Sequence, residues 1–260
     1  MTIYIPRSAE EYGFVTDGLG THSSRTMMFS ELSLLLADCP PYATLDDYRE
    51  EIIENNILLK QTESTRNKSF RHLRELYGLD VSCRFFRALR DLWCEDAEVQ
   101  AQLAVLCATS RDPSLRSTAS VILDAPQGSS ITPQMLAKAA EEAYPTLNQS
   151  TLAKIGRNTA STWTQSGHLN GRSNKKRSII TSHPTSVAYA LFISYLTGVR
   201  GSALFSTFWC QLLDAPIHTL HNQASVASQH GWLEYRHSGD VTDISFRYLL
   251  RDNHTEGNHE

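Results

Sequence analysis

Helical spacing of apolar residues is the feature that most restricts how this 260-residue chain can fold. From about Ser24 onward, apolar residues recur every three or four positions in one segment after another, which is the spacing of a helix face. Sequence typical of β-strands occurs only in short pieces near 168–180 and 232–247. We therefore expect a mainly α fold, a helical bundle with helix-turn-helix or winged-helix units and two short β-hairpins.

Proline, glycine and capping residues divide this pattern into separate helices. Cys39-Pro40-Pro41 ends the first, because proline has no N–H to donate and restricts the residue before it. Thr44 or Asp46 can cap the next helix, and Ser64 is predicted to cap a further one that Gly78 closes. This order of helix, short turn and helix is typical of a helix-turn-helix.

A second group of helices follows the predicted linker Gln127–Ser130. Thr132 and Pro133 are predicted to begin a helix that ends at Tyr144. The predicted division of the chain is an N-terminal arm (1–25), an N-terminal helical domain (26–125) with a helix-turn-helix at about 47–78, and a C-terminal domain (126–260) with a winged-helix unit at about 131–181 and a second winged-helix-like unit at about 186–248.

Positive charge is concentrated in two islands, although the whole chain carries a net charge of −4. Residues 151–180 hold six basic residues and no Asp or Glu, and residues 60–90 hold eight basic against three acidic residues, so the rest sums to −15. Basic islands in an acidic body indicate a surface for polyanions. Two solvated helix faces would give the same counts, and this alternative stays open.

The second island begins on a helix predicted from Ser150. Its apolar residues fall on one arc, and its basic and hydroxyl residues, which can donate to phosphates, fall on the other. A glycine, a short strand, a basic loop and another short strand follow, which is the order of a winged helix. A packed helix followed by an incidental hairpin is the alternative. The residues expected to contact DNA are Lys154, Arg157 and Ser161 on the helix and Arg172, Lys175, Lys176 and Arg177 in the wing.

The first island gives a less distinct pattern. Lys68, Arg71 and Arg74 form an i, i+3, i+6 stripe opposite the apolar face of the helix that ends at Tyr77. We expect a second DNA contact here, although a solvated basic face would look the same.

A third stretch repeats the winged order without the charge. A helix opened by Pro216 is followed by a predicted hairpin, and the residues expected to pack inward from it are Ile217, Leu220, Ala224 and Ala227. Acidic residues make this hairpin a poor phosphate binder, and they are Glu234, Asp240 and Asp243. We expect it to pack against the rest of the protein or against a partner.

Sequence patterns of enzymes were not found. The chain has no phosphate-loop lysine motif, no nucleophile elbow and no H-E-x-x-H. His218 and His221 lie three residues apart, but no Cys or carboxylate nearby supplies a third metal ligand, so surface histidines are the simpler interpretation. We expect no catalysis, cofactor or metal.

The compartment follows from the cysteines and the apolar runs. Five cysteines without a C-x-x-C indicate reduced thiols. Residues Met1–Glu11 contain no signal-peptide core, and the run Val187–Leu196 is too short to span a bilayer. We expect a cytoplasmic protein that makes no contact with a membrane.

Two stretches also carry a resemblance to a known family. The first contains Phe29-Ser30-Glu31-Leu32, Glu54-Asn55-Asn56-Ile57-Leu58 and Arg71-His72-Leu73-Arg74. The second contains Leu152-Ala153-Lys154-Ile155, Trp163, Ser166-Gly167-His168-Leu169, Gly198-Val199-Arg200-Gly201 and Gly231-Trp232-Leu233-Glu234-Tyr235. Over about residues 24–107 and 130–250 the chain resembles the BrxA family of bacteriophage-exclusion (BREX) defence systems.

This resemblance implies an α-helical protein that carries helix-turn-helix units, binds double-stranded DNA and has no catalysis of its own. It also implies partners in the same system, namely its methyltransferase, ATPase and phosphatase-like proteins. The expectation is therefore a non-catalytic DNA-binding component of phage defence. The alternatives are an adaptor whose winged helices dock other defence proteins, and a transcriptional regulator.

Overall fold

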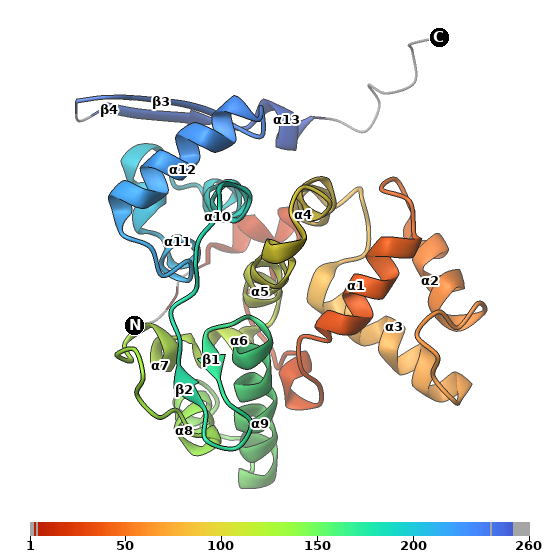
Figure 1. The fold of residues 1–260 in the computed structure, drawn as a ribbon. Coiled ribbons are helices and arrows are strands. Elements are labelled where there is room, and N and C mark those ends of the chain that lie inside the picture. Colours follow the sequence, from red (N-terminus) through yellow and green to blue (C-terminus); the bar gives the residue numbers. More distant parts are fainter. Residues whose placement is uncertain (1–2, 4, 240, 252–260) are drawn as a thin grey trace.

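Figure 1 shows the computed structural model of the chain, which describes residues 3, 5–239 and 241–251. The fold is mainly helical and has two small two-stranded antiparallel sheets, so the predicted coarse fold class is confirmed. The longer helices are α1 (Phe29–Asp38), α2 (Leu45–Ile53), α3 (Glu63–Tyr77), α4 (Arg84–Trp93), α5 (Gln100–Arg111), α8 (Pro133–Ala143), α9 (Gln149–Gln165), α10 (Pro184–Leu196) and α12 (Ile217–Gln229). The shorter helical turns are η1 (Arg7–Tyr12), η2 (Thr21–Ser23), η3 (Ala97–Val99), α6 (Pro113–Arg116), α7 (Ala119–Leu123), η4 (Gly201–Ser206), α11 (Phe208–Gln211) and α13 (Arg247–Leu250).

Side-chain caps fix the beginnings of the N-terminal helices. Thr44 caps α2 in a reciprocal capping box with Asp47, whose carboxylate accepts from the Thr44 N–H at 2.7 Å. The cap of α3 is Thr62, which accepts from the Thr65 N–H, so the prediction of Ser64 is wrong by two residues. Ser64 already lies in the first turn of the helix. Gly78 ends α3 with φ 93°, a left-handed conformation that glycine adopts without strain.

The predicted boundaries of α8 and α9 are confirmed to within one residue. Thr132 caps α8 with Pro133 at its first position, and Tyr144 follows the last helical residue. α9 begins at Gln149, one residue before the predicted Ser150, because the Asn148 side chain accepts from the Thr151 N–H at 2.9 Å.

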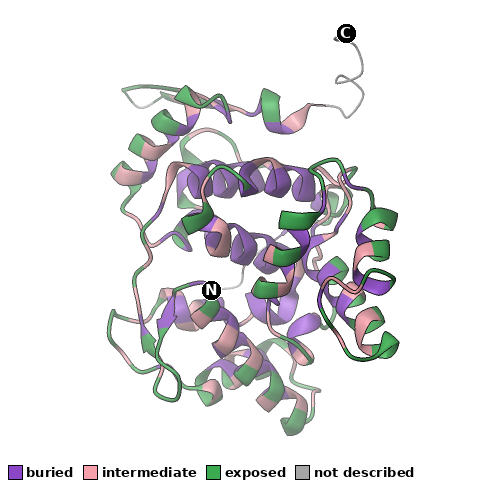
Figure 2. Cartoon of the chain, turned by 45° about the vertical axis from the view of Figure 1, so that its right-hand side comes forward, coloured by how far each residue is buried: buried purple, intermediate pink, exposed green. Residues whose placement is uncertain are grey.

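The core is built around α5 and α10, which run through the middle of the molecule and are buried along most of their length (Figure 2). The Tyr189 hydroxyl of α10 donates to the Phe85 carbonyl of α4 at 3.2 Å, which joins these layers. One continuous apolar cluster reaches from Ile5 to Leu249. A small second cluster fills the space between α8 and α9.

Residues of the predicted N-terminal arm lie against this core. Phe14 packs edge-on against Phe85, with ring centroids 5.2 Å apart. Thr21 and His22 of η2 are buried as well. This part of the chain therefore has a fixed position relative to α3 and α9.

Both predicted hairpins are present. β1 (Leu169–Asn170) pairs antiparallel with β2 (Lys176–Arg177), and Ser130 forms a further antiparallel bridge to Lys176 on the other side. Gly171 has φ 106°, and a Cβ there would lie 2.3 Å from the Asn174 carbonyl oxygen, so only glycine fits this turn. In the second sheet, β3 (Glu234–Ser238) pairs antiparallel with β4 (Val241–Ser245).

One predicted core residue of α12 lies at the surface. Leu220, Ala224 and Ala227 are buried as expected, but Ile217 is 52% exposed because it is the first residue of the helix and extends past the core. Asp240 and the tail after Arg251 lie outside the described residues. Among the residues that the structure describes, no helix is long and apolar enough to cross a bilayer.

Candidate nucleic-acid interface

The polar face of α9, made of Lys154, Arg157, Ser161 and Gln165, is the centre of the candidate interface. Lys154 and Arg157 are exposed and Ser161 is half-buried, while the opposite face of the helix is buried as the sequence predicts. α9 contains no Asp or Glu, so no carboxylate on the helix opposes an approaching phosphate. Gly156 lets α8 pack closely behind this helix, since a Cβ there would lie 2.2 Å from the Pro133 carbonyl oxygen.

The β1–β2 hairpin flanks one side of this face (Figure 1). The Lys175 ammonium donates to the Thr164 hydroxyl at 2.7 Å, which ties the hairpin to α9. Partial burial lowers the pKa of Lys175. Arg172 and Lys176 are exposed beyond it. The hairpin thus offers two solvent-facing cations and one that is partly engaged by the protein.

Arg177 is not part of this surface, which corrects the sequence prediction. It is only 3% exposed, and its guanidinium forms a two-pronged ion pair with Asp214, one Nη1–Oδ2 contact being 3.0 Å. Its Nε donates to the Ile122 carbonyl at 2.8 Å. Arg177 therefore anchors the base of the hairpin to the core and is not available to a phosphate.

The basic stripe of α3 is exposed as predicted. Lys68, Arg71 and Arg74 all face solvent. Arg71 has Glu75 at 3.7 Å, an exposed pair that contributes about 0.5 kcal/mol or less to stability. These side chains are therefore exposed to solvent and can bind an anion such as a phosphate.

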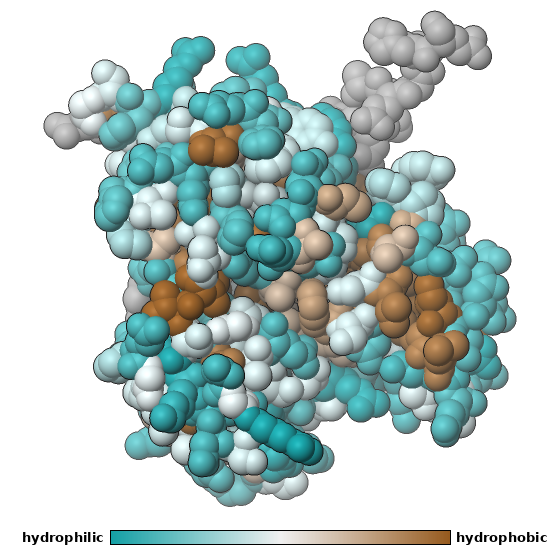
Figure 3. Space-filling view, viewed as in Figure 1, coloured by the Kyte–Doolittle hydropathy of each residue, from teal (hydrophilic) through white to brown (hydrophobic). Residues whose placement is uncertain are grey.

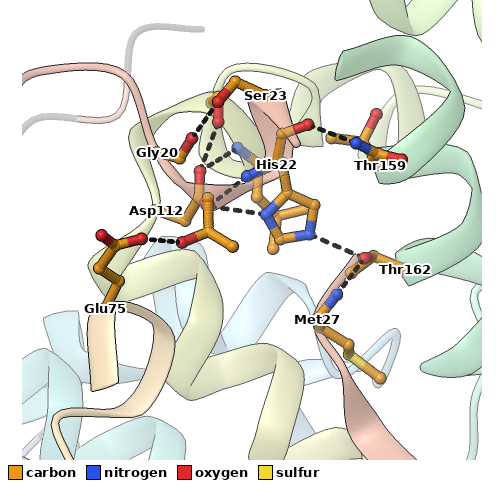
Figure 4. Close-up of polar contacts among 12 residues, drawn as sticks. Gly20, His22, Ser23, Met27, Glu75, Asp112, Thr159 and Thr162 are labelled. Atoms are coloured by element: carbon orange, nitrogen blue, oxygen red, sulfur yellow. Dashed lines mark hydrogen bonds and ion pairs between the residues drawn. The ribbon is translucent and has the colours of Figure 1, made fainter. Parts of the chain in front are cut away.

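The short turn η2 joins α3 to α9 through polar contacts that are buried or partly buried (Figure 4). The Thr21 hydroxyl donates to Glu75 of α3 at 2.7 Å. On the other side, Asn158 of α9 donates to the His22 carbonyl at 2.9 Å, and His22 Nε2 lies 2.7 Å from the Thr162 hydroxyl. These contacts hold the two basic helices on either side of one short segment.

Asp112 is the anionic end of this network. Its carboxylate lies 2.7 Å from His22 Nδ1 and also accepts from the Ser114 hydroxyl and the Leu115 N–H. Burial alone would raise the pKa of Asp112, but the facing His22 and these donors hold it at about 2. Asp112, His22 and Thr162 lie in the order of a nucleophile relay, yet all three are buried and the Thr162 oxygen accepts from the Met27 N–H, so the network is structural.

Both basic islands border one depression of about 270 Å³. Thr65 and Ser69 of α3 line one wall, Asn158 of α9 lines the other, and Arg25 and Lys60 stand at its rim. Lys60 pairs with Glu31 at 3.0 Å, so the rim retains one net positive charge from these three groups. Sequence reasoning did not single out Arg25, because nothing in its irregular segment signals that it lies near both helices.

Comparison with known protein families and curated proteins does not identify a family for this chain. A scan of protein-family models found no match to this chain, and a search of curated proteins found none either. In the part of the chain that the structure describes, no group of three or more His, Cys, Asp or Glu side chains could hold a metal ion.

Proposed function

We propose that this chain is a non-catalytic protein that binds double-stranded DNA, with the polar face of α9 in the major groove. The observation that carries the proposal is the charge of this face, because Lys154 and Arg157 are exposed on a helix without a carboxylate. Side chains of this kind donate to phosphates and to base edges in the major groove.

The order of elements supports a winged-helix unit. α7, the Ser130 bridge, α8, α9 and the β1–β2 hairpin follow one another, and Ser130 pairs with β2 in an antiparallel bridge. In this interpretation α8 supports the recognition helix α9, and Arg172, Lys175 and Lys176 form a wing on the DNA backbone. Lys68, Arg71 and Arg74 of α3 would make a second contact, with Arg25 between the two.

The resemblance to the BrxA family supports a role in phage defence. We propose that the chain acts in the cytoplasm as a component of a BREX system, beside its methyltransferase, ATPase and phosphatase-like proteins. A transcriptional regulator would use the same face, and protection of one defined operator in a footprint would identify that role.

The test compares two glutamine variants that keep helix propensity. Binding of a random duplex of 30–40 base pairs is followed by fluorescence anisotropy at three salt concentrations. For K154Q/R157Q we expect a salt slope of log affinity that is smaller by about 1.8, because each phosphate contact contributes about 0.9. The control R49Q removes an exposed arginine of α2 and should leave the slope unchanged. An unchanged slope in K154Q/R157Q refutes the assignment of α9.

A further inference from the structure

The α1–α2 surface combines exposed apolar side chains with strong negative charge. Leu34 of α1 is 53% exposed, Tyr42 in the α1–α2 loop is 79% exposed, and Leu59 in the α2–α3 loop is 85% exposed. Figure 3 shows apolar side chains gathered over α1 and the neighbouring loop. Exposed apolar residues that gather in this way, within a polar rim, are typical of an interaction site.

Leu59 is held outward by its backbone. It has φ 50°, a left-handed conformation that leucine rarely adopts. The turn is closed by the Leu59 N–H, which donates to the Asn56 carbonyl at 2.8 Å, and by the Lys60 N–H, which donates to the Asn56 side chain at 2.8 Å. A large apolar side chain in a strained and exposed turn is unfavourable for the isolated chain, which indicates a use outside it.

The rim of this surface is acidic. Residues 29–59 contain seven Asp and Glu and one arginine, so the segment carries −6. Leu34 lies one helical turn from Asp38 and from Glu31, which pairs with Lys60 at 3.0 Å. Glu50 of α2 and Glu54, which follows the last residue of that helix, are exposed. Such a surface repels DNA, although Glu31 also lines the depression between the two basic islands.

We infer that this α1–α2 surface docks a basic amphipathic segment of another protein. Leucine-type side chains of that segment would cover Leu34, Tyr42 and Leu59, and its Lys or Arg residues would meet the acidic rim. The charge complementarity selects this occupant over an acidic protein or a nucleic acid. The inference does not depend on DNA binding by α9.

The probe is a fluorescein-labelled designed peptide of about 14 leucines and lysines, with the leucines on one helix face. A scrambled peptide of the same composition controls for charge alone. The variant L34Q/L59N removes both apolar groups, and asparagine tolerates the left-handed backbone at position 59. V241S is the control, because Val241 is an exposed apolar residue of β4.

We expect the full chain to bind the amphipathic peptide more tightly than the scrambled one. L34Q/L59N should weaken binding by about tenfold or more, and E50Q/E54Q by about threefold at low salt. V241S should bind as the unchanged chain does, and L34Q/L59N should retain its thermal stability and its DNA binding. Equal binding of the two peptides, or unchanged affinity in L34Q/L59N, overturns the inference. Dimers in sedimentation that L34Q/L59N abolishes would also overturn it, because the occupant would then be a second copy.

Discussion

Lys176 and Arg177 are neighbours in the sequence, and their replacement by alanine should have opposite consequences. Arg177 is buried and paired with Asp214, which also accepts from the Ile180 N–H. Removing the guanidinium leaves the Asp214 carboxylate buried without its countercharge, and loss of one partner of such a pair costs about 3–5 kcal/mol. Lys176 is exposed, and the structure gives it no comparable role in stability.

For a chain of this size each kcal/mol shifts the melting temperature by about 2–4 °C, so R177A should melt about 6–20 °C lower. K176A should melt as the unchanged protein does. Its salt slope for DNA binding should fall by about 0.9, while the slope of R177A stays the same below its melting temperature. Calorimetry and anisotropy on the same preparations measure both quantities.

A second variant separates lost charge pairing from lost packing. R177M/D214N removes both charges and keeps a residue that tolerates the positive φ of position 214, so it should recover much of the stability that R177A loses. The reasoning is refuted if R177A melts normally and weakens DNA binding with a smaller salt slope, as an exposed phosphate contact would.

Two further predictions concern the supports of the interface. Because the pKa of Asp112 is held at about 2 in the folded chain, against 3.8 ordinarily, its ionised form contributes about 2 kcal/mol at pH above about 4, and this contribution is lost as the pH falls towards 2. Urea titrations at pH 6 and pH 3 should therefore show a smaller loss of stability in D112N than in the unchanged chain. G156A should destabilise the protein by about 1–3 kcal/mol, because its Cβ meets the Pro133 carbonyl, whereas A153G at a half-buried position of the same helix should cost about 1 kcal/mol without moving α8. A G156A protein that melts normally and binds DNA unchanged would contradict the close packing of α8 on α9.

Local signals in the sequence were enough to predict the helix ends and the buried face of α9. Thr132, Pro133 and Gly78 act through contacts within a few residues, so their roles can be inferred from sequence. The cap of α3 shows the limit of such inference. Both the predicted Ser64 and the observed Thr62 can cap a helix, and only the backbone conformation decides between them.

Long-range contacts could not be predicted in this way. Arg177 belongs to a basic run in which nothing local distinguishes it from Lys176, and its partner Asp214 lies 37 residues away. Likewise, α3 and α9 are brought together through Thr21 and His22, whose partners Glu75 and Thr162 lie 54 and 140 residues away. The sequence could identify the basic residues, but only the packing separates those that face solvent from those that hold the fold.

The most direct test of the central claim is the affinity of the unchanged chain for a random duplex of 30–40 base pairs at three salt concentrations. If about five phosphates are neutralised, log affinity should fall with log salt at a slope of about −4 to −5. Micromolar or tighter binding at low salt with such a slope is the predicted result. An absence of binding at low salt, or binding that salt does not weaken, would contradict the account.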